Sequence, residues 1–198
     1  RAVAVWHRRA GKDSLSLNWT AKAMLQRVGV YWHMLPLNTQ ARKVVWDAID
    51  KQGRRIIDQV FPVPLRKSVN ASEMKIELWN GSIWQCVGSD NYNNLVGANP
   101  VGVVFSEYSL ADPEAWDYLR PILAENDGWA LFIYTPRGKN HGYKLFNTAK
   151  NAGWFVQKLT VDDTKAIPLE AIENERKSGM SESKIQQEFY CSFETLDD

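Results

Sequence analysis

A short apolar run followed by a glycine and a lysine is the part of this sequence most suited to chemistry. Ala2-Val3-Ala4-Val5 predicts a strand, and the segment from Trp6 to Asp13 (W-H-R-R-A-G-K-D) leads from it into a predicted helix. At such a turn, backbone N–H groups point at an anion and the lysine adds a positive charge, so the segment can bind phosphate groups. The usual pattern is G-x-x-x-x-G-K-[ST]. Here Trp6 replaces the first glycine and Asp13 replaces the Ser or Thr.

A second apolar run ends in a carboxylate. Residues 101–106 predict a buried strand that ends at Ser106, and Glu107 follows it. In phosphate-loop ATPases, an acidic residue at such a strand end helps to hold Mg²⁺, and the Glu after it orients and deprotonates the attacking water. Ser106 takes the first position and Glu107 the second. The alternative is a core strand that ends in a surface Glu.

A third apolar run, Trp129–Tyr134, ends in Thr135-Pro136 and a basic loop that contains a glycine. A Thr at this place is suited to sensing the γ-phosphate and passing its loss to a moving element. A simple Pro-Arg-Gly turn is the alternative.

In this order, the segments resemble the ATPase domain of the terminase large subunit of tailed bacteriophages, the motor that packages viral DNA. The resemblance covers nearly the whole chain. It implies an α/β P-loop NTPase fold: a doubly wound, mostly parallel sheet with flanking helices and a β-hairpin. The matching segments are H-R-R-A-G-K-D at 7–13, Asn38–Arg42, V-V-F-S-E-Y at 103–108, T-P-R-G-K-N-H at 135–141 and Gln187–Tyr190.

The resemblance implies ATP hydrolysis by in-line attack of water, with ATP and Mg²⁺ as cofactors. The implied catalytic residues are Glu107, Arg8 and Lys12, of which Arg8 is the cation for the transferred phosphoryl group. A second arginine from a neighbouring subunit is a further expectation. Arg42 is a candidate for it, and Val96 stands where relatives often carry an arginine. The implied nucleotide-binding residues are His7, Arg8, Arg9, Ala10, Gly11, Lys12, Asp13 and Ser14.

The expected Mg²⁺ ligands are Asp13, Ser106 and Glu107. Because Ser106 lacks the charge of the usual Asp, we expect Asp13 to compensate from the other side of the ion, with Ser14 as the alternative ligand. Thr135 and Asn140, with His141 nearby, are the expected coupling residues.

For Arg9, Asn140 and His141, simple helix-end or turn polarity is the alternative. Asp162-Asp163 is expected to cap a loop rather than to take part in catalysis.

The implied partners are double-stranded DNA, the portal protein of the procapsid, the small terminase subunit and further copies in a ring. The implied place is the cytoplasm of the infected bacterium, away from any membrane.

Two other functions remain open. One is a superfamily-2 helicase-like translocase, although Ser106–Ser109 is not a D-E-x-H box. The other is a catalytically inactive nucleotide-binding scaffold module, given Asp13 and Ser106 at the Mg²⁺ positions.

The composition fits one globular enzyme domain. The chain has 198 residues, of which 44% are hydrophobic and 24% charged. A net charge of +1 argues against a general nucleic-acid coat protein. Two cysteines far apart suggest neither a disulfide framework nor a zinc site, and neither a membrane span nor a signal peptide is expected.

The expected domains are an ATPase domain over residues 1–180 and a terminal helix or linker over 181–198. That segment would lead toward a nuclease domain, for which the ten residues after Glu188 leave no room. The resemblance also implies that the adenine-contacting elements lie upstream of this chain.

Strands and helices are expected to alternate, which predicts the parallel sheet and places the three strand ends at one edge. Asn80-Gly81-Ser82 predicts a hairpin turn. We expect an irregular segment at 57–69 and a loop at 89–100. The expected strands are 2–5, 28–35, 74–79, 83–87, 101–106, 129–134 and 154–161. The expected helices are 13–27, 39–49 with Asn38 as N-cap, 113–125, 141–151 and two near the C-terminus.

Overall fold

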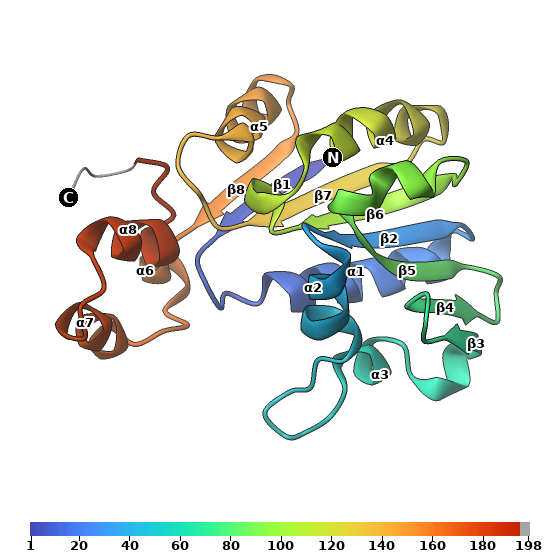
Figure 1. Ribbon diagram of the computed structural model, residues 1–198, viewed down its shortest axis with the longest axis horizontal. Coiled ribbons are helices and arrows are strands. Elements are labelled where there is room, and N and C mark those ends of the chain that lie inside the picture. The colour runs from blue at the N-terminus through green and yellow to red at the C-terminus, as the bar shows by residue number, and fades with distance from the viewer. Residues whose placement is uncertain (195–198) are drawn as a thin grey trace. The chain divides into compact units, whose positions relative to one another are not determined.

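The computed structural model describes residues 1–194, and its strands form one sheet in the order β3-β4-β5-β2-β6-β7-β1-β8 (Figure 1). The strands are β1 (Ala2–Trp6), β2 (Val30–Leu35), β3 (Arg66–Asn70), β4 (Lys75–Leu78), β5 (Ile83–Gly88), β6 (Pro100–Ser106), β7 (Trp129–Tyr134) and β8 (Phe155–Leu159). The helices are α1 (Lys12–Gln26), α2 (Asn38–Ala41), α3 (Ile56–Val60), α4 (Pro113–Glu125), α5 (His141–Asn151), α6 (Val161–Thr164), α7 (Leu169–Lys177) and α8 (Glu182–Tyr190). Within residues 1–194, no helix has the length and apolar character needed to cross a membrane.

The sheet is mostly parallel, as predicted. Strand β2 pairs in parallel with both β5 and β6, and β1 pairs in parallel with β8. Strands β3, β4 and β5 are antiparallel, and the predicted hairpin joins β4 to β5. Gly81 turns that hairpin with a φ of +97°, a backbone angle that residues with a Cβ rarely adopt. The predicted α/β class is therefore confirmed.

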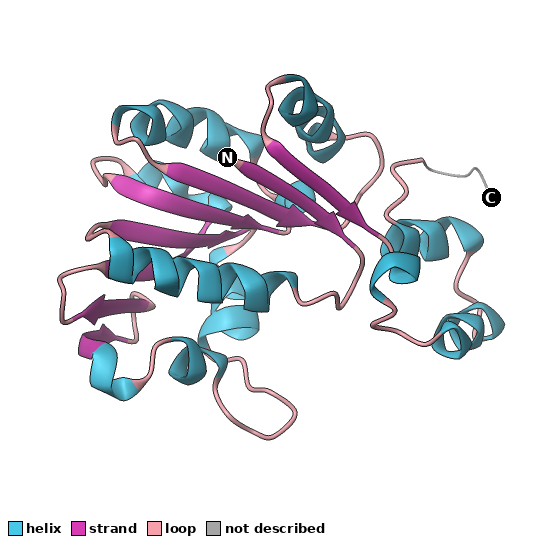
Figure 2. Cartoon of the chain, turned by 180° about the vertical axis from the view of Figure 1, so that it is seen from behind, coloured by secondary structure: helices cyan, strands magenta, loops and turns pink. Residues whose placement is uncertain are grey.

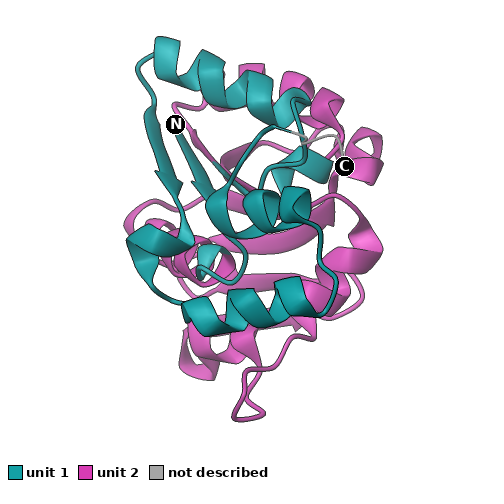
Figure 3. Ribbon diagram, turned by 90° about the vertical axis from the view of Figure 1, so that its left-hand side faces the viewer, with its two compact units in different colours: residues 1–12, 107–110, 132–198 teal, residues 13–106, 111–131 magenta. Residues whose placement is uncertain are grey.

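The chain divides into two compact units (Figure 3). The first unit contains residues 1–12, 107–110 and 132 onward, and the second contains residues 13–106 and 111–131.

The second unit has one large apolar core. Helix α1 packs its buried Leu17 and Met24 against the strands, and the core ring of Trp84 stacks on Trp46. Helix α4 lies on the other side of β2 and β6 from α1 (Figures 1 and 2). Helix α4 begins where Asp112 accepts a hydrogen bond from the backbone N–H of Glu114, as an N-cap residue should.

The first unit has two parts. Helix α5 is amphipathic and buries Leu145, Phe146 and Ala149 beside β1 and β8. The three C-terminal helices α6, α7 and α8 enclose a small core of their own, made of Val161, Ile172, Ile185 and Phe189.

Two of the predicted elements were wrong. The expected helix over 39–49 is instead α2 followed by a π-helix, Arg42–Trp46, and the N-cap residue is Leu37 rather than Asn38. The expected irregular segment over 57–69 contains most of α3, a 3-10 turn and strand β3. Strand β3 escaped prediction because Arg66 is half-buried and its other four residues are exposed, so no alternation of apolar and polar residues marks it.

Two smaller expectations concern loops. The expected loop at 89–100 contains a 3-10 segment, Ser89–Leu95. The Asp163 carboxylate accepts hydrogen bonds from the backbone N–H and the hydroxyl of Thr160 at 2.7 and 2.8 Å. Asp163 therefore helps to cap the start of the helix α6, where a loop was expected.

Candidate functional site

The segment between β1 and α1 forms a tight loop. The N–H of His7 donates to the carbonyl of Leu159 at 3.0 Å and extends the β1–β8 pairing by one residue. The chain then turns through left-handed backbone angles at Arg9 (φ +62°) and Gly11 (φ +80°). The Trp6 indole donates to the side chain of Gln157 at 3.1 Å, so a large residue has a structural use where the usual loop has glycine.

Lys12 lies beneath this loop and is buried, with 7% of its surface exposed. Its ammonium group donates to the carbonyl oxygens of His7 (3.0 Å) and Trp6 (3.3 Å). It also lies 3.3 Å from the hydroxyl oxygen of Thr135, at the end of β7. The Thr135 hydroxyl in turn donates to the carbonyl of Trp6 at 3.0 Å. The structure therefore brings two predicted site residues, Lys12 and Thr135, together within the first unit.

His7 is an anchor of the loop and is fully buried. Nδ1 lies 2.7 Å from the carbonyl of Arg8 and must donate to it, so in the neutral ring Nε2 accepts from the hydroxyl of Thr164 at 2.6 Å. Burial lowers the pKa of His7, and nearby Lys12 lowers it further, against the opposite effects of the Arg8 carbonyl and Asp163. The ring therefore holds the loop to α6.

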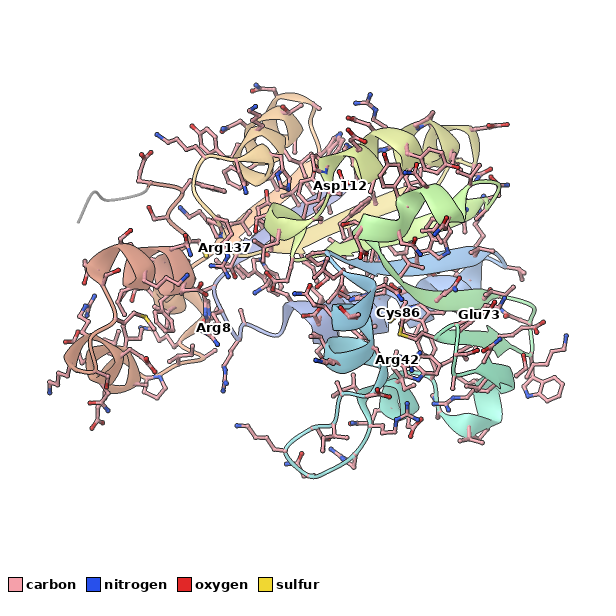
Figure 4. All side chains as sticks on the ribbon, viewed as in Figure 1. Arg8, Arg42, Glu73, Cys86, Asp112 and Arg137 are labelled. Carbon is pink, nitrogen blue, oxygen red and sulfur yellow. The ribbon has the colours of Figure 1, made fainter. Side chains whose placement is uncertain are left out.

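Helix α8 holds the same loop. The backbone N–H of Arg8 donates to the carbonyl of Glu188 at 2.8 Å, while the Arg8 side chain is exposed. The Glu188 carboxylate is almost completely buried and pairs with Arg137 (Figure 4) and, at 3.5 Å, with Lys184. Burial opposes ionisation of Glu188, but Arg137, together with Lys184 and Gln187, leaves the pKa of this carboxyl below the ordinary value.

Glu107 begins a short turn directly after β6. It is half-buried and has a left-handed φ of +53°. The turn behind it, Tyr108–Leu110, is held by α5: Asn140 donates to the carbonyl of Ser109 at 2.7 Å, and His141 donates to the carbonyl of Tyr108 at 2.6 Å. Asn140 is also the N-cap of α5.

The strand end at Thr135 contacts the same turn. The Ser109 hydroxyl donates to the carbonyl of Thr135 at 2.8 Å. Two expected coupling residues, Thr135 and Asn140, therefore contact the turn that follows Glu107.

In the second unit, Asp13 and Ser106 are direct partners. The Ser106 hydroxyl donates to Asp13 Oδ1 at 2.7 Å, and Nε2 of His33 lies 3.3 Å from the same oxygen. Ser106 and His33 are buried, whereas 38% of the Asp13 side chain is exposed. A carboxylate and a hydroxyl oxygen are hard ligands of the kind that Mg²⁺ prefers, so these residues fit a magnesium site.

Four further positions were singled out in the sequence: Arg9, Ser14, Arg42 and Val96. Ser14 is exposed, as is Arg9. The Arg42 guanidinium donates to the carbonyls of Ala71 (2.9 Å) and Ser72 (3.1 Å), so it braces a turn near Cys86 (Figure 4) rather than projecting outward. Val96 is exposed.

Sequence reasoning missed His33, Thr164 and Arg137. A lone His in an apolar strand suggests only a core residue, and a Thr in a short helix carries no motif. Arg137 does lie inside the matching T-P-R-G-K-N-H segment, but its partner Glu188 could be paired with it only from the structure.

No family model matches the chain. Among curated proteins, the terminase large subunit of Escherichia phage T5 is 29% identical over 136 residues, which are 65% of this chain and 30% of that protein. The terminase large subunit of Thermus phage G20c is 27% identical over 161 residues, which are 74% of this chain and 33% of that protein. The chain thus spans about a third of the length of the curated relatives that it matches.

Solved structures show the same relationship at the level of the fold. The large terminase ATPase domain of Thermus phage P74-26 superimposes with a TM-score of 0.77 at 21% identity, covering 98% of this chain and 88% of that one. The large terminase of a thermophilic bacteriophage, in complex with ATP-gamma-S, has a TM-score of 0.73 at 13% identity, covering 97% of this chain and 47% of that one. The chain is therefore similar in sequence to the phage terminase large subunits, and its fold is that of the phage large terminase ATPase domain.

Proposed function

We propose that this chain is the ATPase motor domain of a phage terminase large subunit, which hydrolyses ATP to drive double-stranded DNA into a procapsid. The observation that carries the proposal is the position of Lys12. Its buried ammonium group lies at the base of a strand–loop–helix turn and is hydrogen-bonded to the loop carbonyls and to Thr135. That is the arrangement expected of a lysine that exchanges carbonyl partners for phosphate oxygens.

In the proposed reaction, the loop residues 7–14 bind the nucleotide. The backbone N–H groups of residues 9–13 face the phosphates, and Lys12 pairs with the β- and γ-phosphate oxygens. Glu107 accepts a proton from the attacking water. Arg8, whose side chain is exposed at the loop, stabilises the charge that develops on the transferred phosphoryl group.

Asp13, Ser106 and Glu107 are the proposed ligands of the divalent cation. When bound, Mg²⁺ neutralises charge on the phosphate oxygens. The Asp13 carboxylate supplies the negative charge that Ser106 lacks, and the 2.7 Å bond between the two side chains supports their acting as a pair.

Thr135 and Asn140 are proposed to couple hydrolysis to DNA movement. Thr135 contacts Lys12 through its hydroxyl and Ser109 through its carbonyl, so a change at the loop lysine reaches the turn after Glu107 through one residue. Asn140 contacts the same turn through Ser109.

The remaining parts of the proposal concern the whole protein. We propose that residues 1–180 are the ATPase domain and that residues 181–198, the last four of which lie outside the described residues, lead toward a nuclease domain. The proposed partners are double-stranded DNA, the portal protein, the small terminase subunit and further copies in a ring, in the cytoplasm of the infected bacterium. The support is the name of the curated relatives.

The first test is binding of a fluorescent, non-hydrolysable ATP analogue to the chain with and without Mg²⁺. We expect Lys12→Ala to abolish binding and Asp13→Ala to remove the Mg²⁺ dependence. Lys139→Ala is the matched control, because that exposed lysine pairs with Glu194 and not with the loop. Equal binding by Lys12→Ala and the parent chain would overturn the proposal.

The second test separates a motor from an inactive nucleotide-binding module. Glu107→Gln should bind the analogue like the parent chain but lose ATP turnover, measured as phosphate release with DNA present. Turnover that survives this change would remove Glu107 from its proposed role.

A further inference from the structure

The buried histidine of β2 contacts the proposed cation site. His33 is completely buried between β5 and β6, where its register partners are Cys86 and Val104. Its Nε2 lies 3.3 Å from Asp13 Oδ1. Its other ring nitrogen, Nδ1, is buried and has no hydrogen-bond partner among residues 1–194.

The direction of this hydrogen bond follows from chemistry. An ionised carboxylate only accepts, so Nε2 must carry the proton and donate it. The Ser106 hydroxyl donates to the same oxygen at 2.7 Å. Two donors from the neighbouring strands β2 and β6 therefore converge on Oδ1, and this fixes the direction in which the carboxylate of Asp13 points.

The unpaired Nδ1 indicates that packing alone does not explain this residue. Every other residue of β2 is apolar or aromatic. A leucine or methionine would fill the position without burying an unpaired ring nitrogen, which opposes folding. What the imidazole adds, and an aliphatic side chain cannot, is the bond to Asp13.

We propose that His33 is a positioning residue for the divalent cation: it orients the Asp13 carboxylate, and through it the cation, without touching either the cation or the nucleotide. This inference rests on the proposed function. Groups that orient metal-binding side chains typically change metal affinity by about 10- to 100-fold when they are removed. His33 should therefore act on the cation and leave the affinity for metal-free nucleotide unchanged.

The test compares two amides at this position. The Nε2 amide of His33→Gln reaches about as far as the imidazole Nε2, whereas the shorter His33→Asn places its amide near the Nδ1 position and cannot reach Asp13. Both bury an amide, so their folding penalties are matched. His33→Leu fills the position without any polar atom. It gives a third measurement if burying an amide there prevents the chain from folding.

The measurement is a Mg²⁺ titration of the 198-residue chain with the fluorescent, non-hydrolysable ATP analogue, repeated in EDTA. We expect His33→Asn and His33→Leu to raise the apparent Kd for Mg²⁺ by about 10- to 100-fold, and His33→Gln to stay within about threefold of the parent chain. Affinity for the analogue in EDTA should be the same in all of them. Ser82→Ala is the control for a general loss of stability, since Ser82 is buried and its hydroxyl donates to the carbonyl of Met24, in the last turn of α1, whereas Asp13 lies in the first turn.

The outcomes separate this inference from the proposed function. If His33→Asn and His33→Leu keep the parent Kd for Mg²⁺ while Asp13→Ala loses it, His33 is only a core residue and the inference is wrong. If His33→Gln is as impaired as His33→Asn, the bond to Asp13 is not the cause and the inference is also wrong. If Lys12→Ala binds the analogue like the parent chain, the proposed function fails instead.

Discussion

The hydroxyl of Thr135 stands between the ammonium group of Lys12 and the carbonyl oxygen of Trp6, 3.3 Å from the first and 3.0 Å from the second. The carbonyl of the same residue accepts from the Ser109 hydroxyl at 2.8 Å. One residue at the end of β7 thus contacts the loop lysine on one side and the turn after Glu107 on the other.

Removing the Thr135 hydroxyl should make the position of the Lys12 ammonium group less fixed. Thr135→Val keeps the shape but loses both hydrogen bonds, so we expect the free energy of unfolding to fall by about 1–2 kcal/mol. ATP turnover should fall while binding of the non-hydrolysable analogue persists. Thr135→Ser, which keeps the hydroxyl, should retain turnover. Urea unfolding and phosphate release measure the two effects, and equal turnover in the Val and Ser variants would contradict the role of the hydroxyl.

The anchor at His7 predicts a pH dependence. Its pKa in the folded chain lies below the ordinary 6.5, chiefly because the ring is buried, so below that pH the unfolded chain binds more protons than the folded one. The contribution of His7 to stability is therefore present above about pH 6.5 and is lost as the pH falls through the lowered value. Urea unfolding between pH 5 and 8 measures it. The stability difference between the parent chain and His7→Gln should shrink as the pH falls, and a constant difference would contradict the prediction.

The buried ion pair on α8 should matter more than the exposed pair close to it in sequence. Arg137→Ala leaves the Glu188 carboxylate, with 5% of its side chain exposed, without its main partner, which should cost about 3 kcal/mol of unfolding free energy. Lys139→Ala breaks an exposed, solvent-screened pair with Glu194 and should lower the unfolding free energy much less. Urea unfolding of both variants is the measurement. Similar losses would mean that burial does not set the strength of these pairs.

Gly102 marks a close approach within the second unit. A Cβ there would lie 2.5 Å from the ring of Trp129 and 2.7 Å from that of Tyr31, which themselves pack together with centroids 6.0 Å apart. Gly102→Ala should therefore lower the unfolding free energy by about 1–3 kcal/mol. Thermal unfolding checks this, and an unchanged midpoint would show that the two rings can move apart at little cost.

The sequence predicts those parts of the fold that have strong local signals. Strand β6 is a continuous apolar run, and the turn at Gly81 has a residue that tolerates its positive φ. The helix expected over 39–49 failed because apolar spacing does not reveal where a helix widens into a π-turn, which here begins at Arg42. Strand β3 failed because a polar edge strand has no hydrophobic period.

The same contrast, between residues with a local sequence signal and residues without one, applies to the candidate site. Lys12, Thr135 and Asn140 could be named from their places at strand and helix ends, and the structure gives each of them a partner at those ends. His33 could not be named, because its importance depends on a contact with Asp13, 20 residues away in the chain. Contacts of this kind exist only after the strands have paired.

The bond between Asp13 and Ser106 limits how this loop can change. Position 13 has a carboxylate where a hydroxyl is usual, and position 106 has a hydroxyl where a carboxylate is usual. The two groups are 2.7 Å apart. Asp13→Ser alone would leave two hydroxyls and no carboxylate, whereas Ser106→Asp alone would bring two carboxylates together, where they repel. The two positions are therefore epistatic: every route of single substitutions from this arrangement to the usual one passes through an impaired intermediate, and only the paired exchange preserves the charge.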